Sequence, residues 1–268
     1  MLSLSFFLGY LLTIIVGISI GLLGSGGSIL FLPILVYSFN INPIEASTYC
    51  NLIIGITSAV ASFSYLIKKN INLKYCIIFL SLSTFFTYIG KHYVMNLLPN
   101  DIWIINKNSL LMLMFATLMI VASLQISNNQ NFVKLLNKKI LYIKFILSAS
   151  FVGLITGMLG AGAGFLIVPL FLSMLKLPMK EAIGSSLLII AINSLSFLIY
   201  TPLANININN IVLICLALAI LGMLIAIFFI GPKISPNNLK KFMKFIIFSL
   251  GIIIFASEIF NLLKILNT

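Results

Sequence analysis

Long apolar runs dominate this sequence and restrict the folds that it can adopt. A helix needs about 20 consecutive apolar residues to cross a bilayer, and several of the runs reach that length. Hydrophobic residues make up 61% of the 268 residues and charged residues 7%, whereas a soluble domain carries about 25% charged residues. We therefore expect an all-α, multi-pass protein of the inner (plasma) membrane. Its ten hydrophobic segments run over residues 4–23, 28–39, 45–67, 73–95, 109–125, 141–159, 164–175, 181–201, 208–230 and 241–264.

The positive charges predict how these segments cross the membrane. All 16 basic residues are lysines, and short cytoplasmic loops carry the excess of basic residues. If all ten segments cross, thirteen lysines fall on one side and three, Lys91, Lys107 and Lys264, on the other. If the two short segments only dip in and return, the split becomes seven against nine. The charges therefore favour ten crossings, with both termini outside the cytoplasm.

The chain contains an internal repeat. Residues 17–46 align without a gap with residues 153–182, and nine of the 30 pairs are identical, where chance gives roughly three. Each half holds five segments, so the second half enters the membrane from the opposite side, as in many secondary transporters. We divide the chain into a first transmembrane repeat (1–125), a polar cytoplasmic linker (126–140) and a second transmembrane repeat (141–268).

A glycine-rich motif opens the short second segment of each repeat. The motifs start at Gly24 and Gly160 and end at Pro33 and Pro169, which we expect to set a kink or a helix end. Short, glycine-interrupted segments of this kind mark the substrate site of inverted-repeat transporters. The N–H groups and the positive dipole end at a helix start favour an anion. The predicted substrate-binding residues of the motifs are Gly24, Ser25, Gly26, Gly27, Ser28, Gly160, Gly162, Ala163 and Gly164.

Close helix packing is the alternative explanation for small residues in membrane helices. We favour packing for Gly17, Gly21, Gly153 and Gly157, which precede the motifs at helical spacing. Packing alone does not require so many adjacent small residues followed by a proline at a fixed distance. We therefore keep the two motifs as the predicted substrate lining.

The motifs resemble those of the TauE/SafE sulfite exporter family, a group of bacterial membrane permeases. Both have the form G-x-G-(G/A)-x-x-x-x-x-P, and residues 181–187 (EAIGSSL) are similar to the small-residue stretch that follows the motif in that family. Residues 45–51 (EASTYCN) are a looser match in the first half. The resemblance covers essentially the whole chain. It implies passage of small sulfur-containing anions such as sulfite or sulfonates, usually outward.

Polar residues after the motifs complete the predicted site. Hydroxyls and amides can bind an anion without the cost of burying a lysine charge. We add the neutral residues of the third and eighth segments, although each could instead bond a neighbouring helix: Thr48, Asn51, Ser185, Ser186 and Asn193.

The acidic residues are few. The repeat-related Glu45 and Glu181 lie early in predicted helices, which favours capping of the helix start and leaves coupling to protons or substrate as the alternative. Asp101 and Glu258 are expected in loops or at the membrane interface, and His92 near a segment end.

These features argue against most other functions. One histidine and four acids give little material for an enzyme or a metal site, and the sequence has no ATP-binding P-loop. We expect no catalysis, no cofactor and no nucleic-acid partner. The leading hypothesis is a secondary transporter that exports a small anion, bound between two glycine-rich helix starts in the lipid bilayer. An anion channel is the nearest alternative, and a structural or assembly membrane protein is a more distant one.

Overall fold

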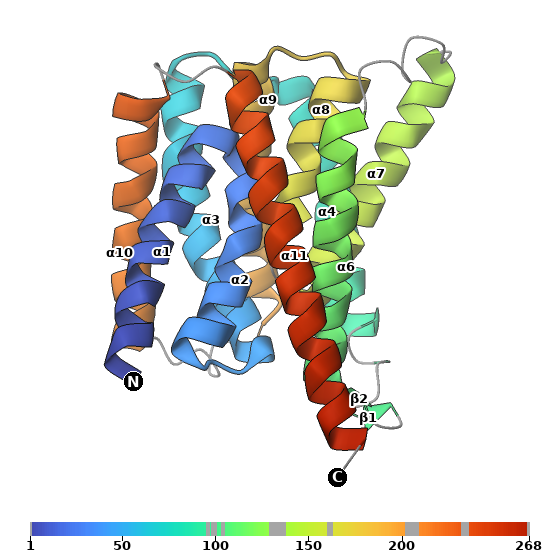
Figure 1. Ribbon diagram of the computed structural model, residues 1–268. Helices are drawn as coiled ribbons and strands as arrows, with labels where there is room; N and C mark the ends of the chain where they lie inside the picture. The colour runs from blue at the N-terminus through green and yellow to red at the C-terminus, as the bar shows by residue number, and fades with distance from the viewer. Residues whose placement is uncertain are drawn as a thin grey trace.

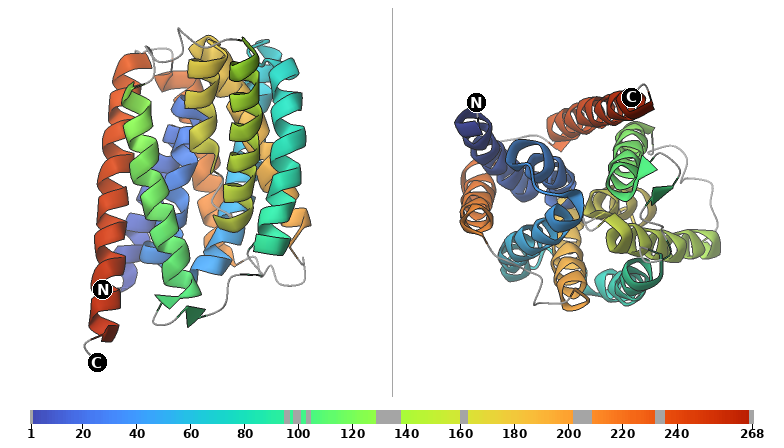
Figure 2. Two further views of the ribbon diagram at one scale, coloured as in Figure 1. Left: turned by 90° about the vertical axis from the view of Figure 1, so that its right-hand side faces the viewer. Right: turned by 90° about the horizontal axis from the view of Figure 1, so that it is seen from below.

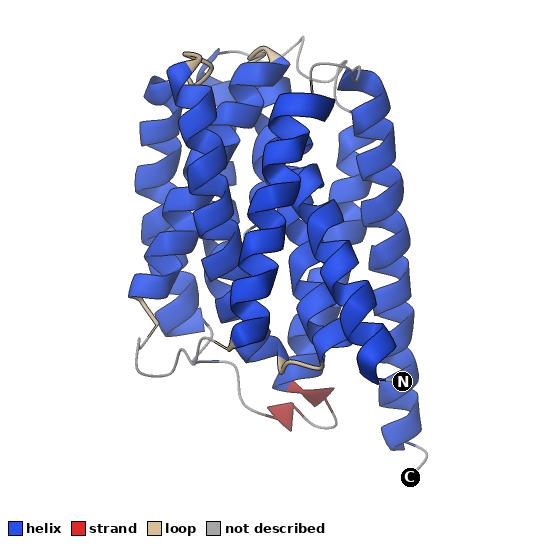
Figure 3. Cartoon of the chain, turned by 90° about the vertical axis from the view of Figure 1, so that its left-hand side faces the viewer, coloured by secondary structure: helices blue, strands red, loops and turns tan. Residues whose placement is uncertain are grey.

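The computed structural model describes residues 2–94, 97, 101–102, 105–128, 138–159, 163–201, 209–231 and 236–266. This part of the chain is helical apart from short loops and a small hairpin of β1 (Asp101–Ile102) and β2 (Ile105–Asn106), as Figure 3 shows. Six of its helices are long and apolar enough to cross a membrane. The predicted fold class, an all-α membrane protein that crosses several times, is confirmed.

The helices of the first half follow the apolar runs. Residues 24–38 form one continuous helical body, which we call the first short helix, and it changes from 3₁₀ through α to π geometry along its length. The elements are α1 (Leu2–Leu23), η1 (Gly24–Leu30), α2 (Phe31–Pro33), η2 (Ile34–Ser38), α3 (Pro43–Ile67), α4 (Leu73–Ile89), η3 (Gly90–Val94) and α6 (Lys107–Asn128).

The second half has corresponding elements. Its second short helix consists of η5 (Ala163–Leu166) and α8 (Ile167–Met174). The other helices are α7 (Lys138–Leu159), α9 (Met179–Ile199), α10 (Asn210–Ile225), η7 (Ala226–Ile230) and α11 (Pro236–Leu266).

Consecutive helices run in opposite directions between two ends of the molecule (Figures 1 and 2). At the upper end of Figure 1, α4 and α9 begin side by side, and the Asn72 N–H donates to Ser185 Oγ at 2.9 Å. At the lower end α1 begins and α11 ends, and the rings of Tyr88 and Tyr200 pack with centroids 5.1 Å apart. The chain thus passes repeatedly from one end to the other; ten membrane crossings stay a prediction.

The internal repeat recurs in the packing. Four glycines approach carbonyls of neighbouring helices so closely that a Cβ atom would not fit. The 136-residue shift relates the two glycines of the first half to those of the second, and it relates the contacted carbonyls in the same way. The pairs are Gly17–Ala219, Gly21–Met223, Gly153–Ser83 and Gly157–Thr87. The packing role predicted for these four glycines is therefore confirmed.

Local backbone features repeat at the same spacing. The π-helical elements η3 and η7 begin 136 residues apart. After each short helix the chain turns at a residue with φ of 52°, Asn40 in the first half and Lys176 in the second. These correspondences support two structurally equivalent halves. Their opposite orientation across a membrane stays a prediction.

A central pair of helices connects the halves. The repeat-related α3 and α9 pack against each other, α9 also packs on α4, and α3 packs on α10. Their packing is antiparallel, because Gly55 of α3 faces Ser194 of α9 while Gly184 of α9 faces Tyr65 of α3. Outside them α1 lies on α10, α7 lies on α4, and α6 pairs with α11.

One acidic residue lies in an unexpected place. Glu258 was expected in a loop or at the membrane interface, but it belongs to α11 and is 7% exposed. Tyr37 Oη donates a hydrogen bond to Glu258 Oε1 at 3.0 Å. The expectation of a loop is therefore wrong, since the tyrosine of the first short helix covers this carboxyl group.

Candidate functional site

The first glycine motif forms a tight reversal inside the protein. Gly24 has φ of +67°, a backbone conformation that residues with a Cβ atom disfavour. This residue turns the chain from α1 into η1, so that η1 packs back on α1. Gly27 lies against Ser19 and Ile20 of α1, where a Cβ atom would collide with both residues. Gly24 and Gly27 therefore have conformational and packing reasons to be glycine.

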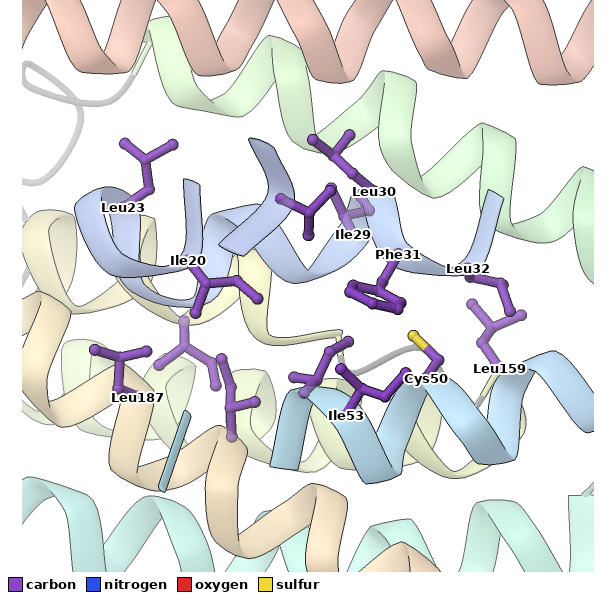
Figure 4. Packing of buried hydrophobic residues seen from close by; sticks show 14 of the residues in the cluster. Ile20, Leu23, Ile29, Leu30, Phe31, Leu32, Cys50, Ile53, Leu159 and Leu187 are labelled. Atoms are coloured by element: carbon purple, nitrogen blue, oxygen red, sulfur yellow. The ribbon is translucent and has the colours of Figure 1, made fainter. Parts of the chain in front are cut away.

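The two short helices meet in the interior. η1 contacts η5, and both also contact α9. Figure 4 shows the surroundings of the first short helix, where Phe31 lies close to Cys50 and Ile53 of α3, all of them buried. The first short helix thus contacts the described part of the second one, whereas convergence of the two glycine clusters stays a prediction.

The described motif residues differ in their surroundings. Ser28 is 1% exposed, and its carbonyl accepts the Phe31 N–H in the 3₁₀ pattern. Gly164 is buried in η5, and Ala163 is the first residue of that element. Ser25 and Gly26 belong to η1, and the structure describes only their backbone. Gly160 and Gly162 lie outside the described residues.

The prolines do not end the short helices. Pro33 is the last residue of α2, at the change from α to π geometry, and the helical body continues to Ser38. Pro169 is the third residue of α8, directly after the η5 segment, and the helix continues to Met174. The change of geometry at Pro33 agrees with the predicted irregularity, whereas Pro169 lies within α8 without ending it.

Among the polar residues predicted on α9, Ser186 alone is placed against the first motif. A Cβ atom on Gly24 would lie 2.7 Å from Ser186 Oγ, which donates to the Ile183 carbonyl at 2.8 Å. Ser185 accepts the Asn72 N–H, and Asn193 exchanges hydrogen bonds with Ser83 of α4. Ser185 and Asn193 therefore connect α9 to the start and the middle of α4.

The predicted polar residues on α3 bond within their own helix. Asn51 is fully buried, and its Nδ2 donates to the Ser47 carbonyl at 2.9 Å. Thr48 is partly exposed, and its Oγ1 lies 3.5 Å from the Ile44 carbonyl oxygen. The structure thus brings Gly24, Ser186 and the two short helices together, whereas Thr48 and Asn51 bond locally.

The two repeat-related acids lie in the first turns of helices, of which α3 has a side-chain cap and α9 does not. The Asn42 side chain accepts the Ile44 N–H at 3.1 Å, Pro43 is the first helical residue, and Glu45 lies in the first turn of α3. Glu181 lies in the first turn of α9. Both acids are thus positioned to stabilise the positive end of a helix dipole, which supports the capping interpretation.

Sequence reasoning missed three buried hydroxyls near the centre of the α3–α9 pair: Thr57, Ser58 and Ser194. None of these has a hydrogen-bond partner in the described part of the structure. The 136-residue shift relates Ser58 to Ser194, so a comparison of polar positions between the repeats could have found this pair.

Comparison with known proteins identifies the family. The family model described as "Sulfite exporter TauE/SafE" matches residues 9–254, which includes both motifs and both short helices. The chain belongs to the TauE/SafE family. As a TauE/SafE protein it is a membrane transporter, and the resemblance carried by the two glycine motifs is confirmed.

The relatives agree with this assignment. A probable membrane transporter protein of Methanocaldococcus jannaschii is 29% identical over 269 residues, which cover 94% of this chain and 97% of that protein. Two probable membrane transporter proteins of Xylella fastidiosa strains are 27% and 28% identical, and each match covers 65% of both chains. No solved structure matches the TauE/SafE chain. Within its described residues no group of three or more His, Cys, Asp or Glu side chains could hold a metal ion.

Proposed function

We propose that this TauE/SafE protein is a secondary transporter that carries a small anion between its two short helices. The contact between η1 and η5 is the observation that supports this proposal, since each of these elements contains described residues of one motif. Each helix start carries a partial positive charge, equivalent to about half an elementary charge for a long helix and less for these short ones. Two such starts aimed at one region favour a small negative ligand.

The surroundings of the motifs suit passage rather than tight capture. Gly24, Ser28 and Ser186 are neutral, and backbone N–H groups at a helix start can bind an anion without a buried lysine. The family description favours sulfite or a related sulfur oxyanion as the substrate and export as the direction. The inner membrane is the location that fits such a role.

Flux through purified protein in proteoliposomes tests the proposal. The panel consists of labelled sulfite, sulfate, a small sulfonate and chloride. Saturable uptake of one of the oxyanions, with counter-exchange from preloaded vesicles, is the result expected of a carrier. Flux that neither saturates nor exchanges would instead identify an anion channel. Absence of flux for every member of the panel contradicts the proposed anion transport.

Substitution in the motifs tests the position of the site. We expect Gly26→Leu and Gly162→Leu to lower transport at least tenfold, because a leucine in the predicted substrate lining would obstruct the path. Val121→Leu, at a half-exposed position of α6, is the control. Gel filtration and melting temperature in detergent report folding. If folded Gly26→Leu and Gly162→Leu proteins transport normally, the motifs do not line the path, and α3 and α9 become the better candidates.

A further inference from the structure

Two buried serines of the central helix pair behave differently from most other buried hydroxyls of the chain. Serines in membrane helices commonly bond to a carbonyl of their own helix, as Ser62 does with Ala59 at 2.8 Å and Ser123 with Ile120 at 2.7 Å. Ser58 is 1% exposed and Ser194 is 0% exposed, yet neither Oγ has a partner in the described part of the structure. The described part of the protein thus leaves both hydroxyl groups without a hydrogen bond.

The two serines lie on facing sides of α3 and α9. A Cβ atom placed on Gly55 would be 3.3 Å from the Cβ of Ser194, so Ser194 faces α3. Ser58 follows Gly55 by three residues and shares its side of α3. The rise between these two positions is about 4.5 Å. Ser58 and Ser194 therefore lie within about one helical turn of each other across the interface.

The repeat makes the two hydroxyls equivalent. Ser58 and Ser194 are separated by the 136-residue shift, so each half contributes one hydroxyl from the same position. Gly55 of α3 faces Ser194 of α9, and Tyr65, ten residues later in α3, faces Gly184, ten residues earlier in α9. This register brings the repeat-related positions to one level near Thr57 and Asn193, directly beside the two serines.

The chemistry of this level favours an anion. A buried hydroxyl without a hydrogen bond is costly in the low-dielectric interior, so retention of two at symmetric positions calls for a ligand. Glu45 and Glu181 lie in the first turns of α3 and α9, away from the middle of these helices, and Glu258 of α11 accepts a hydrogen bond from Tyr37. The same helix α9 contacts η1 and η5.

We infer that Ser58 and Ser194 form a second binding position for the transported oxyanion, at the crossing of α3 and α9. Each hydroxyl donates one hydrogen bond to an oxygen of the anion, one from each half. This inference rests on the proposed anion transport and adds the residues that bind the anion beyond the glycine motifs.

The test combines stability with transport in Ser58→Ala, Ser194→Ala and the double variant. Removing an unpaired buried hydroxyl leaves no partner behind, so the melting temperature without substrate should stay equal or rise. The half-saturation concentration for labelled sulfite should rise about tenfold or more in each single variant, since hydrogen bonds to charged groups are the stronger kind. A structural role of the serines would instead lower stability and leave half-saturation unchanged.

Two control variants test whether the effect on half-saturation is specific to the positions of Ser58 and Ser194 or follows the loss of any buried hydroxyl. Thr57→Val removes another buried, unpaired hydroxyl, two residues after Gly55 and therefore on a different side of α3. Ser123→Ala removes a buried hydroxyl that bonds within α6. Both variants should keep the wild-type half-saturation.

The outcomes distinguish this inference from the proposed function. If the wild-type protein transports sulfite or another oxyanion of the panel and both serine variants keep its half-saturation, the second binding position is refuted and anion transport stands. If the wild-type protein transports no anion of the panel, anion transport and the second binding position fall together. Raised half-saturation in the serine variants, with both controls unchanged, supports the binding position.

Discussion

Several close helix contacts in the described part of this protein depend on single glycines. Gly17 lies on the carbonyl of Ala219, and its repeat partner Gly153 lies on the carbonyl of Ser83. Small residues allow membrane helices to approach this closely, which increases dispersion contacts between backbones. A methyl group at either position would separate α1 from α10, or α7 from α4.

We therefore predict that Gly17→Ala and Gly153→Ala lower stability by about 1–3 kcal/mol each, the usual cost of overpacking. Thermal unfolding in detergent measures the change. Gly231→Ala is the matched control, because Gly231 is exposed and its nearest neighbour, the Ala226 carbonyl oxygen, is 3.1 Å from the added atom. Equal melting temperatures for all three variants would contradict the packing role.

A second residue-scale contact joins the first short helix to α11. Tyr37 donates to the buried carboxyl group of Glu258, and its hydroxyl also lies 3.4 Å from Ser257 Oγ. Acidic residues inside membrane helices are costly unless they have partners. The tyrosine therefore provides a hydrogen bond that Glu258 needs in this position.

Removal of the Tyr37 hydroxyl tests whether the protein's stability depends on its hydrogen bond to Glu258. We predict that Tyr37→Phe lowers stability by about 1–3 kcal/mol, because the carboxyl group loses its donor. In Glu258→Leu the acceptor is absent, so the further change to Phe at position 37 should cost much less. Melting temperatures of the two single variants and the double variant measure the coupling. Additive losses would show that the two side chains act independently.

At the scale of elements, the starts of α3 and α9 decide how the repeat-related acids are interpreted. Glu45 is exposed in the first turn of α3, next to the Asn42 cap, and Glu181 occupies the first turn of α9. A carboxylate at this position stabilises the helix through its dipole, typically by about 0.3–1 kcal/mol. Coupling to protons would require, in addition, a change of protonation during transport.

Neutral replacements separate these two roles. We expect Glu45→Gln and Glu181→Gln to lower the melting temperature slightly while the dependence of transport on pH stays that of the wild-type protein. Uptake into proteoliposomes at several external pH values gives this comparison. A pH profile that becomes flat in either variant would instead assign coupling to that acid.

The elements were largely predictable from sequence, since the apolar runs and the repeat depend on local patterns. Apolar length identified the helices, and glycine spacing predicted the packing role of Gly17 and Gly153, though not the helices that they contact. The role of Ser185 was not predictable, because it depends on how the start of α4 meets α9. Burial of Glu258 likewise depends on contact with Tyr37, 221 residues away in the chain. Such pairings come from packing between distant segments, which periodicity does not encode.

At the scale of the whole molecule, the loops at the two ends differ in charge. Lys69, between α3 and α4, and Lys176, between α8 and α9, are exposed at the upper end of Figure 1. Lys91 is one of the few lysines toward the lower end, and its ammonium group lies 4.1 Å from the centroid of the Phe197 ring. Because cytoplasmic loops are rich in lysine, the upper end should face the cytoplasm.

Cysteine labelling of intact cells with a membrane-impermeant maleimide checks this orientation. The native Cys50, Cys76 and Cys215 are buried, so they should give little background. We predict that cysteines placed at Leu97 and Asn209, exposed positions toward the lower end from the two halves, react from outside. Cysteines at Lys69 and Lys176 should react only after the membrane is opened, because the lysine-rich end stays inside. The reverse pattern would invert the orientation. Reaction of Lys69→Cys from outside without reaction of Lys176→Cys would place the α3–α4 and α8–α9 loops on opposite sides of the membrane. An inverted repeat puts these two loops on the same side, so this result would exclude it.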